Sequence, residues 1–276
     1  MIQDIQPLRP GEHRTAGWRR PASHVFTRSD AVAPVVLAEL GELMPYYALA
    51  VLKRPSEAAH LVALLSPIMG RNLYLDADGR WQVPYVPSFY RGYPFRLREL
   101  PAPEGTEEQP VVLCFDHGSG LFRTAPDPKQ GELRFFDDYG ELQSDTARVV
   151  KFLEATYGAR RATDAAVRVL DEARVLRPWT LPGTDKETVK DVPWVRDLYR
   201  VDEQALARLT KGRVVALWKR DALRVAHAQI FSVGRLRALD GLLRTAKMPQ
   251  VGTELPDNVS ELFPRQADDY FDWDKV

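Results

Sequence analysis

The chain of 276 residues carries 38 Lys and Arg against 38 Asp and Glu, so its formal net charge is zero. Without a basic excess, the overall charge provides no field for gripping nucleic acid or an anionic membrane, and we expect neither as a partner. Hydrophobic residues at 45% and charged residues at 28% are typical of a folded globular chain. The single cysteine, Cys114, excludes an intrachain disulfide and a zinc site built on several thiolates.

Two features of the sequence bear on location. The longest stretch without Asp, Glu, Lys or Arg runs from residue 58 to residue 70, well short of the ~18–20 apolar residues that span a bilayer. Residues 1–14 lack both the basic and the apolar region of a secretory signal. We therefore expect a cytoplasmic protein without a membrane span.

In chain order, the first part of the sequence predicts short elements. Residues 29–41 begin with helix-capping Ser and Asp and end in Gly, which predicts a helix. Apolar runs at 46–53 and 61–65 predict consecutive strands, and Asp-Ala-Asp-Gly at 76–79 predicts a turn. Residues 84–95 contain three prolines and five aromatic residues, which favours an ordered loop or short turns over a central strand.

The second part of the sequence is mostly helical in pattern. Apolar residues 111–115 predict a buried strand, and a second strand is expected at 132–136. Helical periodicity extends over 144–176, where Gly158 is expected to break or bend it into two helices. After a connector rich in proline and charge, we expect a short helix, two strand-like or partly helical segments and a final helix, at 202–209, 213–218, 223–230 and 233–243.

Strands precede the main helices instead of alternating with them, which predicts an α+β fold. We expect a single domain with a mixed or antiparallel sheet and helices packed on it. The predicted organisation is an N-terminal extension at 1–14, this domain at 15–245, and an acidic, aromatic C-terminal tail at 246–276.

One stretch is unusually rich in arginine, glycine and tyrosine. It comprises Gly-Arg-Asn-Leu-Tyr-Leu-Asp-Ala-Asp-Gly-Arg-Trp at 70–81, Tyr-Val-Pro at 85–87 and Tyr-Arg-Gly-Tyr-Pro-Phe at 90–95. Shorter motifs lie on either side: Trp-Arg-Arg-Pro-Ala-Ser at 18–23, Val-Leu-Cys-Phe-Asp at 112–116, Leu-Tyr-Arg-Val-Asp at 198–202, Ala-His-Ala-Gln at 226–229 and Ser232. In this order, the motifs make residues 15–245 resemble the SapC family of bacterial proteins.

The resemblance implies an accessory role. The family takes its name from a locus for surface-layer protein export, and its members accompany TonB-dependent outer-membrane receptors. They often occur beside flavin-dependent halogenase-like and cupin-like proteins. The resemblance implies no established reaction and therefore no catalytic residues.

The residue patterns give no clear catalytic or cofactor site. The run 116–120, Asp-His-Gly-Ser-Gly, holds the residue types of a hydrolase triad, but adjacent residues cannot form the required spatial line, so a Gly-rich turn is expected. The acidic turn at 76–79 lacks the spacing of a calcium loop, and the five histidines show no metal-ligand spacing. Neither a dinucleotide fingerprint nor a phosphate-binding loop is present. We expect no metal and no cofactor.

A group of aromatic and arginine residues is the best candidate for binding. Aromatic faces beside guanidinium groups suit a ligand with an apolar or sugar-like face and a carboxylate or phosphate. In the competing interpretation, the rings pack a proline-rich loop and the arginines stack on them. With Asp116, the candidate residues are Trp18, Arg19, Arg20, Arg71, Trp81, Tyr85, Tyr90, Arg91 and Tyr93.

The C-terminal tail is a second candidate. Tyr270, Phe271 and Trp273 alternate with aspartates, a composition suited to docking on a basic, hydrophobic groove. Residues 246–276 hold three basic residues against seven acidic ones, a net charge of −4, which leaves +4 for the rest of the neutral chain. The sequence is compatible with three locations of that groove: another protein, a second subunit in a homo-oligomer, or this chain's own body.

Two functions follow from these patterns. The leading hypothesis is a non-catalytic cytoplasmic accessory or adaptor protein. It would bind a peptide, protein or small ligand in an envelope-export or TonB-dependent nutrient-uptake system. The alternative is an enzyme or enzyme subunit that modifies a peptide or glycan, using polar residues such as Asp116, His117, Arg91 and Tyr90.

Overall fold

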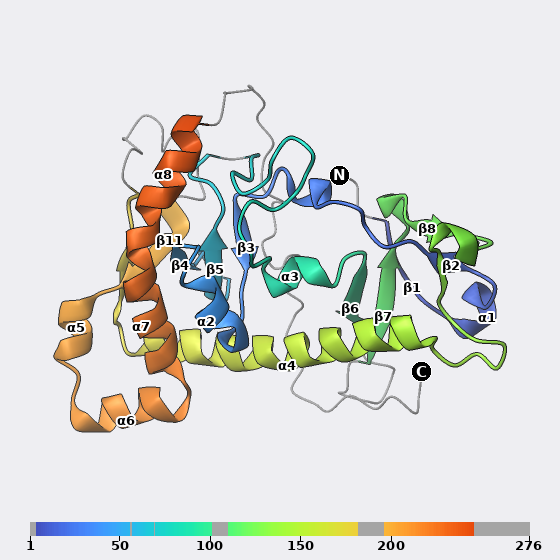
Figure 1. Ribbon diagram of the computed structural model, residues 1–276. Coiled ribbons are helices and arrows are strands. Elements are labelled where there is room, and N and C mark those ends of the chain that lie inside the picture. Colours follow the sequence, from blue (N-terminus) through green and yellow to red (C-terminus); the bar gives the residue numbers. More distant parts are fainter. Residues whose placement is uncertain (1–3, 56, 69, 101–109, 182–195, 246–276) are drawn as a thin grey trace. The chain divides into compact units, whose positions relative to one another are not determined.

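The computed structural model describes residues 4–55, 57–68, 70–100, 110–181 and 196–245 (Figure 1). It combines helices with sheets whose strand pairs are all antiparallel within these residues, which confirms the predicted α+β class. The chain divides into two compact units. The first takes the described residues of 1–23 and 90–157, and the second takes those of 24–89 and 158–262. The division into an N-terminal extension at 1–14, a domain at 15–245 and a tail at 246–276 remains a prediction.

The first unit is built on two small sheets. In one, the strand order is β1 (Ile5–Pro7), β7 (Val111–Asp116) and β6 (Phe95–Glu99); in the other, it is β8 (Phe122–Arg123), β2 (Gly17–Trp18) and β9 (Leu133–Arg134). Their apolar faces enclose one core that includes Trp18, Phe95, Phe115 and Phe135. The short helices of this part are α1 (Pro10–His13), η3 (His117–Ser119) and η4 (Pro128–Gln130).

The second unit is built on a five-stranded sheet. The strand order is β10 (Leu176–Pro178), β11 (Leu198–Val201), β4 (Leu49–Leu52), β5 (His60–Leu64) and β3 (Val32–Pro34). The three strands β3, β4 and β5 are buried along their whole length. That burial explains why they are nearly continuous apolar runs and not alternating ones, with His60 of β5 as a buried polar exception.

Short helices complete the second unit, and α7 packs on β4 and β11. The helical segments that precede β4 in the chain are η1 (Val25–Thr27), η2 (Leu37–Glu39) and α2 (Leu40–Leu43). Those that follow β11 are α5 (Glu203–Ala207), α6 (Lys211–Lys219), α7 (Ala222–Ser232), η6 (Val233–Arg235) and α8 (Leu236–Thr245). Helix α3 (Ser88–Arg91) lies at the boundary where the chain passes from the second unit to the first.

Helix α4 (Ser144–Glu172) is continuous, so the predicted break at Gly158 is wrong. A single glycine inside a helix costs only about 1 kcal/mol relative to alanine, which the flanking helix-forming residues offset. The space beside Gly158 is open, since a Cβ there would meet nothing within 4 Å. The glycine therefore serves neither a kink nor a close contact.

Two further predictions of local structure are wrong. The helix expected at 29–41 is instead strand β3 followed by η2 and α2, because Val32 and Ala33 pair with β5 and Pro34 interrupts helical hydrogen bonding. The segments expected to be strand-like or partly helical at 213–218 and 223–230 are fully helical, in α6 and α7. Local preference for strand in Val- and Ile-containing runs is weak, and packing overrides it.

Other predictions are confirmed. The strands expected at 46–53, 61–65 and 111–115 are β4, β5 and β7. The turn at 76–79 forms, with the Asp76 carboxylate accepting from the Arg80 N–H at 2.8 Å and Gly79 at a φ of 78°. The proline-rich segment 84–95 holds only the short helix α3 before β6 begins.

Candidate functional site

The aromatic and arginine group divides between the two units. Arg71, Trp81 and Tyr85 belong to the second unit. The remaining members, which belong to the first unit, are Trp18, Arg19, Arg20, Tyr90, Arg91, Tyr93 and Asp116. Each part is therefore considered by itself.

In the first unit, the large rings mainly serve packing. Trp18 is 4% exposed, lies edge-on to Phe95 with ring centroids 4.8 Å apart, and donates its indole N–H to the Thr146 hydroxyl at 3.3 Å. Tyr90 is also buried. These contacts match the interpretation of the rings as core residues.

The arginines of the first unit lie at its surface. Arg19 is exposed. Arg20 forms an ion pair with Asp145 at 2.6 Å, and the Arg91 guanidinium lies 5.0 Å from the centre of the Phe152 ring. Exposed pairs of this kind contribute little to stability. The side chains of all three arginines are exposed to solvent.

In the second unit, Trp81 and Tyr85 belong to a network centred on a buried glutamate. Glu39 accepts hydrogen bonds from the Tyr85 hydroxyl at 2.9 Å and from the Ser88 N–H at 2.7 Å. Trp81 donates its indole N–H to the Tyr47 hydroxyl, which donates in turn to the Tyr85 carbonyl. Burial raises the pKa of Tyr47, so it stays a neutral donor. The network anchors the proline-rich segment 84–95. Arg71, which precedes that segment in the chain, is half-buried.

Tyr93 and Asp116, two predicted residues that are distant in sequence, are in contact in the structure. Asp116 is 3% exposed, and its carboxylate accepts from the backbone N–H of Asp4 at 3.1 Å. Burial and the charge of Asp116 raise the pKa of Tyr93 to about 12, while a hydrogen bond from Ser119 lowers it. The phenol is therefore held neutral between a carboxylate and a hydroxyl.

His117 follows Asp116 in the chain, and its Nε2 atom is buried. Its ring stacks on Phe122 with centroids 4.2 Å apart and lies 5.7 Å from the His13 ring. Among the described residues, no group hydrogen-bonds to its Nε2. Burial lowers the pKa of His117, and nearby His13 lowers it further, so the imidazole is neutral at pH 7. We call Tyr93, Asp116, His117 and Ser119 the Tyr93–Asp116 cluster.

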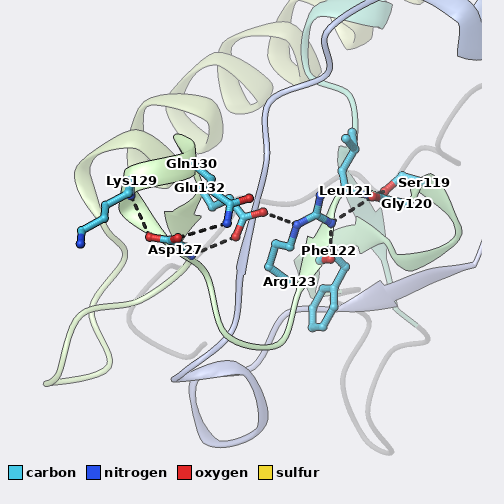
Figure 2. A network of polar contacts seen from close by, with 9 residues as sticks. All are labelled: Ser119, Gly120, Leu121, Phe122, Arg123, Asp127, Lys129, Gln130 and Glu132. Atoms are coloured by element: carbon cyan, nitrogen blue, oxygen red, sulfur yellow. Dashed lines mark hydrogen bonds and ion pairs between the residues drawn. The ribbon is translucent and has the colours of Figure 1, made fainter.

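A polar network fixes the loop that follows His117 and Ser119 (Figure 2). Arg123 donates to the Glu132 carboxylate and to the carbonyls of Gly120 and Phe122. Glu132 also accepts from the Asp127 N–H at 2.9 Å, and this bond with the Arg123 contact lowers the pKa of Glu132. The network holds β8 in place and so positions Phe122 against His117. Ser119 itself bonds to the Leu121 N–H and not to His117, in agreement with a turn at 116–120.

The largest exposed apolar side chains of helix α6 share one face. Lys211, Val214, Val215 and Trp218 occupy positions i, i+3, i+4 and i+7, and Val215 and Trp218 are 51% and 72% exposed. We call these four residues the exposed α6 face. In α6 itself, only Leu217 is buried. A stripe with this spacing normally faces a core, but here its apolar side chains are exposed.

The sequence contains the signal for this face, but the strand-like interpretation of 213–218 concealed it. Read with a helical period, Val214, Val215 and Trp218 form a stripe, and Lys219 lies beside it, four residues after Val215. Figure 1 shows α6 at the edge of the second unit, joined to α7 by a short turn.

The tail residues Tyr270, Phe271 and Trp273 lie outside the described residues. Within the described ranges, no helix is long and apolar enough to cross a membrane. In that same part of the chain, no three His, Cys, Asp or Glu side chains gather as a metal site.

A family model described as SapC matches residues 8–239, most of the chain. No curated protein and no solved structure matches this sequence. The match covers the residues of both units, including the Tyr93–Asp116 cluster and the exposed α6 face.

Proposed function

This chain belongs to the SapC family, and from that premise we propose that it is a non-catalytic cytoplasmic adaptor that binds a protein or peptide partner through the exposed α6 face. The system it serves is envelope export or TonB-dependent nutrient uptake, as the family resemblance implies. The observation that carries the proposal is the exposure of Trp218 at 72% within an apolar helical stripe.

The energetics of such a face favour binding. Tryptophan is among the residues that most often dominate an interface, and removing one from an interface centre costs ~2 kcal/mol or more. Lys211 and Lys219 lie four residues before and after Val215, on the same side of the helix, which favours a partner segment that combines acidic and aromatic residues.

The test is capture of the partner in the native cell with the full-length tagged chain. We expect Trp218→Ala to reduce the captured partner by about 30-fold, the equivalent of ~2 kcal/mol. Tyr139→Ala is the matched control, since Tyr139 is 91% exposed in the other unit. Equal capture by the two variants would contradict the proposal. Unchanged thermal unfolding of Trp218→Ala would show that the loss is not a folding defect.

One observation favours a second function. The Tyr93–Asp116 cluster places a neutral phenol, a buried carboxylate and a neutral imidazole with an unbonded Nε2 close together. Such groups suit proton transfer in an enzyme that modifies a peptide or glycan beside a halogenase-like or cupin-like partner. If this function holds, Tyr93→Phe and His117→Gln lower turnover by ~10²-fold or more in an assay with that partner and a peptide or glycan substrate, because each removes a proton-transfer group. Full activity in both variants would eliminate it.

A further inference from the structure

The two units contain the same arrangement of three antiparallel strands. In the first unit the order is β1, β7 and β6, and in the second β3, β5 and β4 follow one another in the same way at one end of the larger sheet. The registers also agree, since Pro7 pairs with Cys114 in the first unit and Pro34 pairs with Val62 in the second. Strand β6 therefore has the place in the first unit that β4 has in the second.

A turn of the same sequence pattern follows each arrangement. Residues 70–82 and 131–143 both read Gly-x-x-x-aromatic-x-Asp-x-x-Gly-x-x-Gln. In these two segments the Asp carboxylate accepts from the backbone N–H four residues later, at 2.8 Å and 2.9 Å. The second Gly has a φ of 78° in one and 90° in the other. Sequence and backbone thus repeat together, so equivalent positions of the two units can be compared.

The equivalent strands β4 and β6 differ in what lies on their outer side. In the second unit, β11 pairs with β4, with Tyr199 opposite Val51. The Ser232 and Gln229 side chains bond to the backbone N–H and carbonyl of Leu49 on the same side. In the first unit, no strand of the described residues pairs with the outer side of β6. Such an edge can pair with a strand of another chain.

The backbone groups of Leu97 face this outer side. On the inner side, the Asp116 N–H of β7 donates to the Pro94 carbonyl at 2.9 Å. Because successive residues of a strand direct these groups to opposite sides, those of Leu97 point away from β7. Leu97 also has the position of Val51, the residue that pairs with β11 in the second unit. We call the outward backbone groups of Leu97, together with the side chains of Arg96 and Arg98, the β6 edge.

The two arginines specify what the β6 edge binds. Leu97 is buried in the core of the first unit, so Arg96 and Arg98 lie on the other face of the sheet. The residues directly opposite them on β7 are Cys114 and Val112, neither of which is acidic. Opposite charges on adjacent strands stabilise a sheet, and like charges directly opposite one another destabilise it. The arginines therefore favour an added strand with acidic side chains and disfavour the β6 edge of a second copy.

The second unit has an acidic residue at the equivalent edge. Asp197 immediately precedes β11, and its carbonyl accepts from the Lys53 N–H at 2.8 Å. The Asp197 carboxylate lies 3.5 Å from the Arg54 guanidinium. The segment that completes β4 thus combines backbone pairing with an acidic side chain beside a basic one.

We propose that the β6 edge binds an extended segment of a partner protein in which acidic and apolar residues alternate. The segment pairs antiparallel with β6, as β11 does with β4. Its apolar residues lie opposite Leu97, and its acidic residues lie beside Arg96 and Arg98. This inference goes beyond the proposed function, because β6 belongs to the first unit and the exposed α6 face to the second.

Fluorescence anisotropy with a synthetic peptide and the full-length chain tests the charge preference. The probe is fluorescein-labelled Ser-Glu-Val-Glu-Val-Glu-Val-Ser, and its control carries Lys at each Glu. At low ionic strength, we expect the Glu peptide to bind about 10-fold or more tightly than the Lys peptide. The double variant Arg96→Glu with Arg98→Glu reverses this preference, whereas Lys211→Glu with Lys219→Glu, the matched control on α6, does not. Equal affinity of the unmodified chain for both peptides overturns the inference.

Methylated peptides test the backbone pairing on the unmodified chain, so this test does not depend on the folding of a variant. In the proposed antiparallel alignment, the N–H groups of the Val residues face β6 and those of the Glu residues face away. N-methylation of the Val residues therefore abolishes binding, and N-methylation of the Glu residues does not. Equal affinity of the two methylated peptides contradicts pairing at an edge strand.

Two further outcomes would overturn the inference. A dimer in sedimentation that the Glu peptide dissociates would identify a second copy as the occupant. Loss of peptide binding in Trp218→Ala would place the peptide on the exposed α6 face, and the adaptor proposal would then stand without a site on β6. If the inference is correct, Trp218→Ala leaves the peptide affinity unchanged.

Discussion

Gln229 provides the strongest stability prediction, because it links helix α7 to two strands. The side chain is 1% exposed. Its Oε1 accepts from the Val201 N–H of β11 at 2.9 Å, and its Nε2 donates to the Leu49 carbonyl of β4 at 3.1 Å. One residue thus satisfies two buried backbone groups that the sheet leaves unpaired.

The perturbation is Gln229→Met, which keeps a similar side-chain length but removes both hydrogen-bonding groups. Each buried backbone group left without a partner costs about 1–3 kcal/mol. Two such groups, less about 1 kcal/mol gained from burying an apolar side chain, give an expected loss of about 1–5 kcal/mol.

The assay is urea denaturation followed by circular dichroism. We expect the midpoint to fall while the slope against urea is unchanged, since the variant alters stability and not the buried area. His227→Ala on the same helix is the control, because His227 is exposed and its loss costs at most about 0.5 kcal/mol. Equal midpoints for the two variants would refute the assignment of Gln229 as an anchor.

Three other predictions concern glycine, a carboxylate and the thiol. Gly158→Ala stabilises the chain by about 0.5–1 kcal/mol in the same assay, whereas Gly17→Ala destabilises it, since a Cβ there would lie 2.1 Å from the Leu133 carbonyl oxygen. The pKa of Glu132 is lowered from the ordinary value of 4.5, so the stabilisation that its carboxylate provides is fully present above that ordinary value and is lost as the pH falls through the lowered pKa. The free energy of unfolding measured from pH 7 to pH 3 therefore declines less in Glu132→Gln, which lacks the carboxylate. Burial raises the pKa of Cys114 to about 11, so a disulfide reagent at pH 8 reacts only after unfolding.

The stability predictions also explain part of the family motif. The Ala-His-Ala-Gln segment and Ser232 serve the packing of α7, since the Ser232 hydroxyl accepts from the Leu49 N–H at 2.9 Å. In the Trp-Arg-Arg segment, Trp18 is buried and serves packing, whereas Arg19 and Arg20 are exposed. Motif membership alone therefore does not distinguish an anchor from a binding residue.

Residue patterns were sufficient for elements whose apolar content is local. The runs that became β4, β5 and β7 and the long periodic segment of α4 follow from hydrophobic spacing. The α+β class follows from their order along the chain. The family resemblance was likewise legible in the motifs, and the match over residues 8–239 confirms it.

Tertiary packing decided what local pattern left ambiguous. The segments 213–218 and 223–230 are helical; α7 packs one face on β4 and β11, whereas the stripe of α6 is exposed. Packing also paired Tyr93 with Asp116, and it placed Arg71, Trp81 and Tyr85 in the second unit. The net charge of zero predicts neither the exposed stripe of α6 nor the pairing of Tyr93 with Asp116. Exposure and contact depend on residues distant in sequence, whereas composition records only how many of each there are.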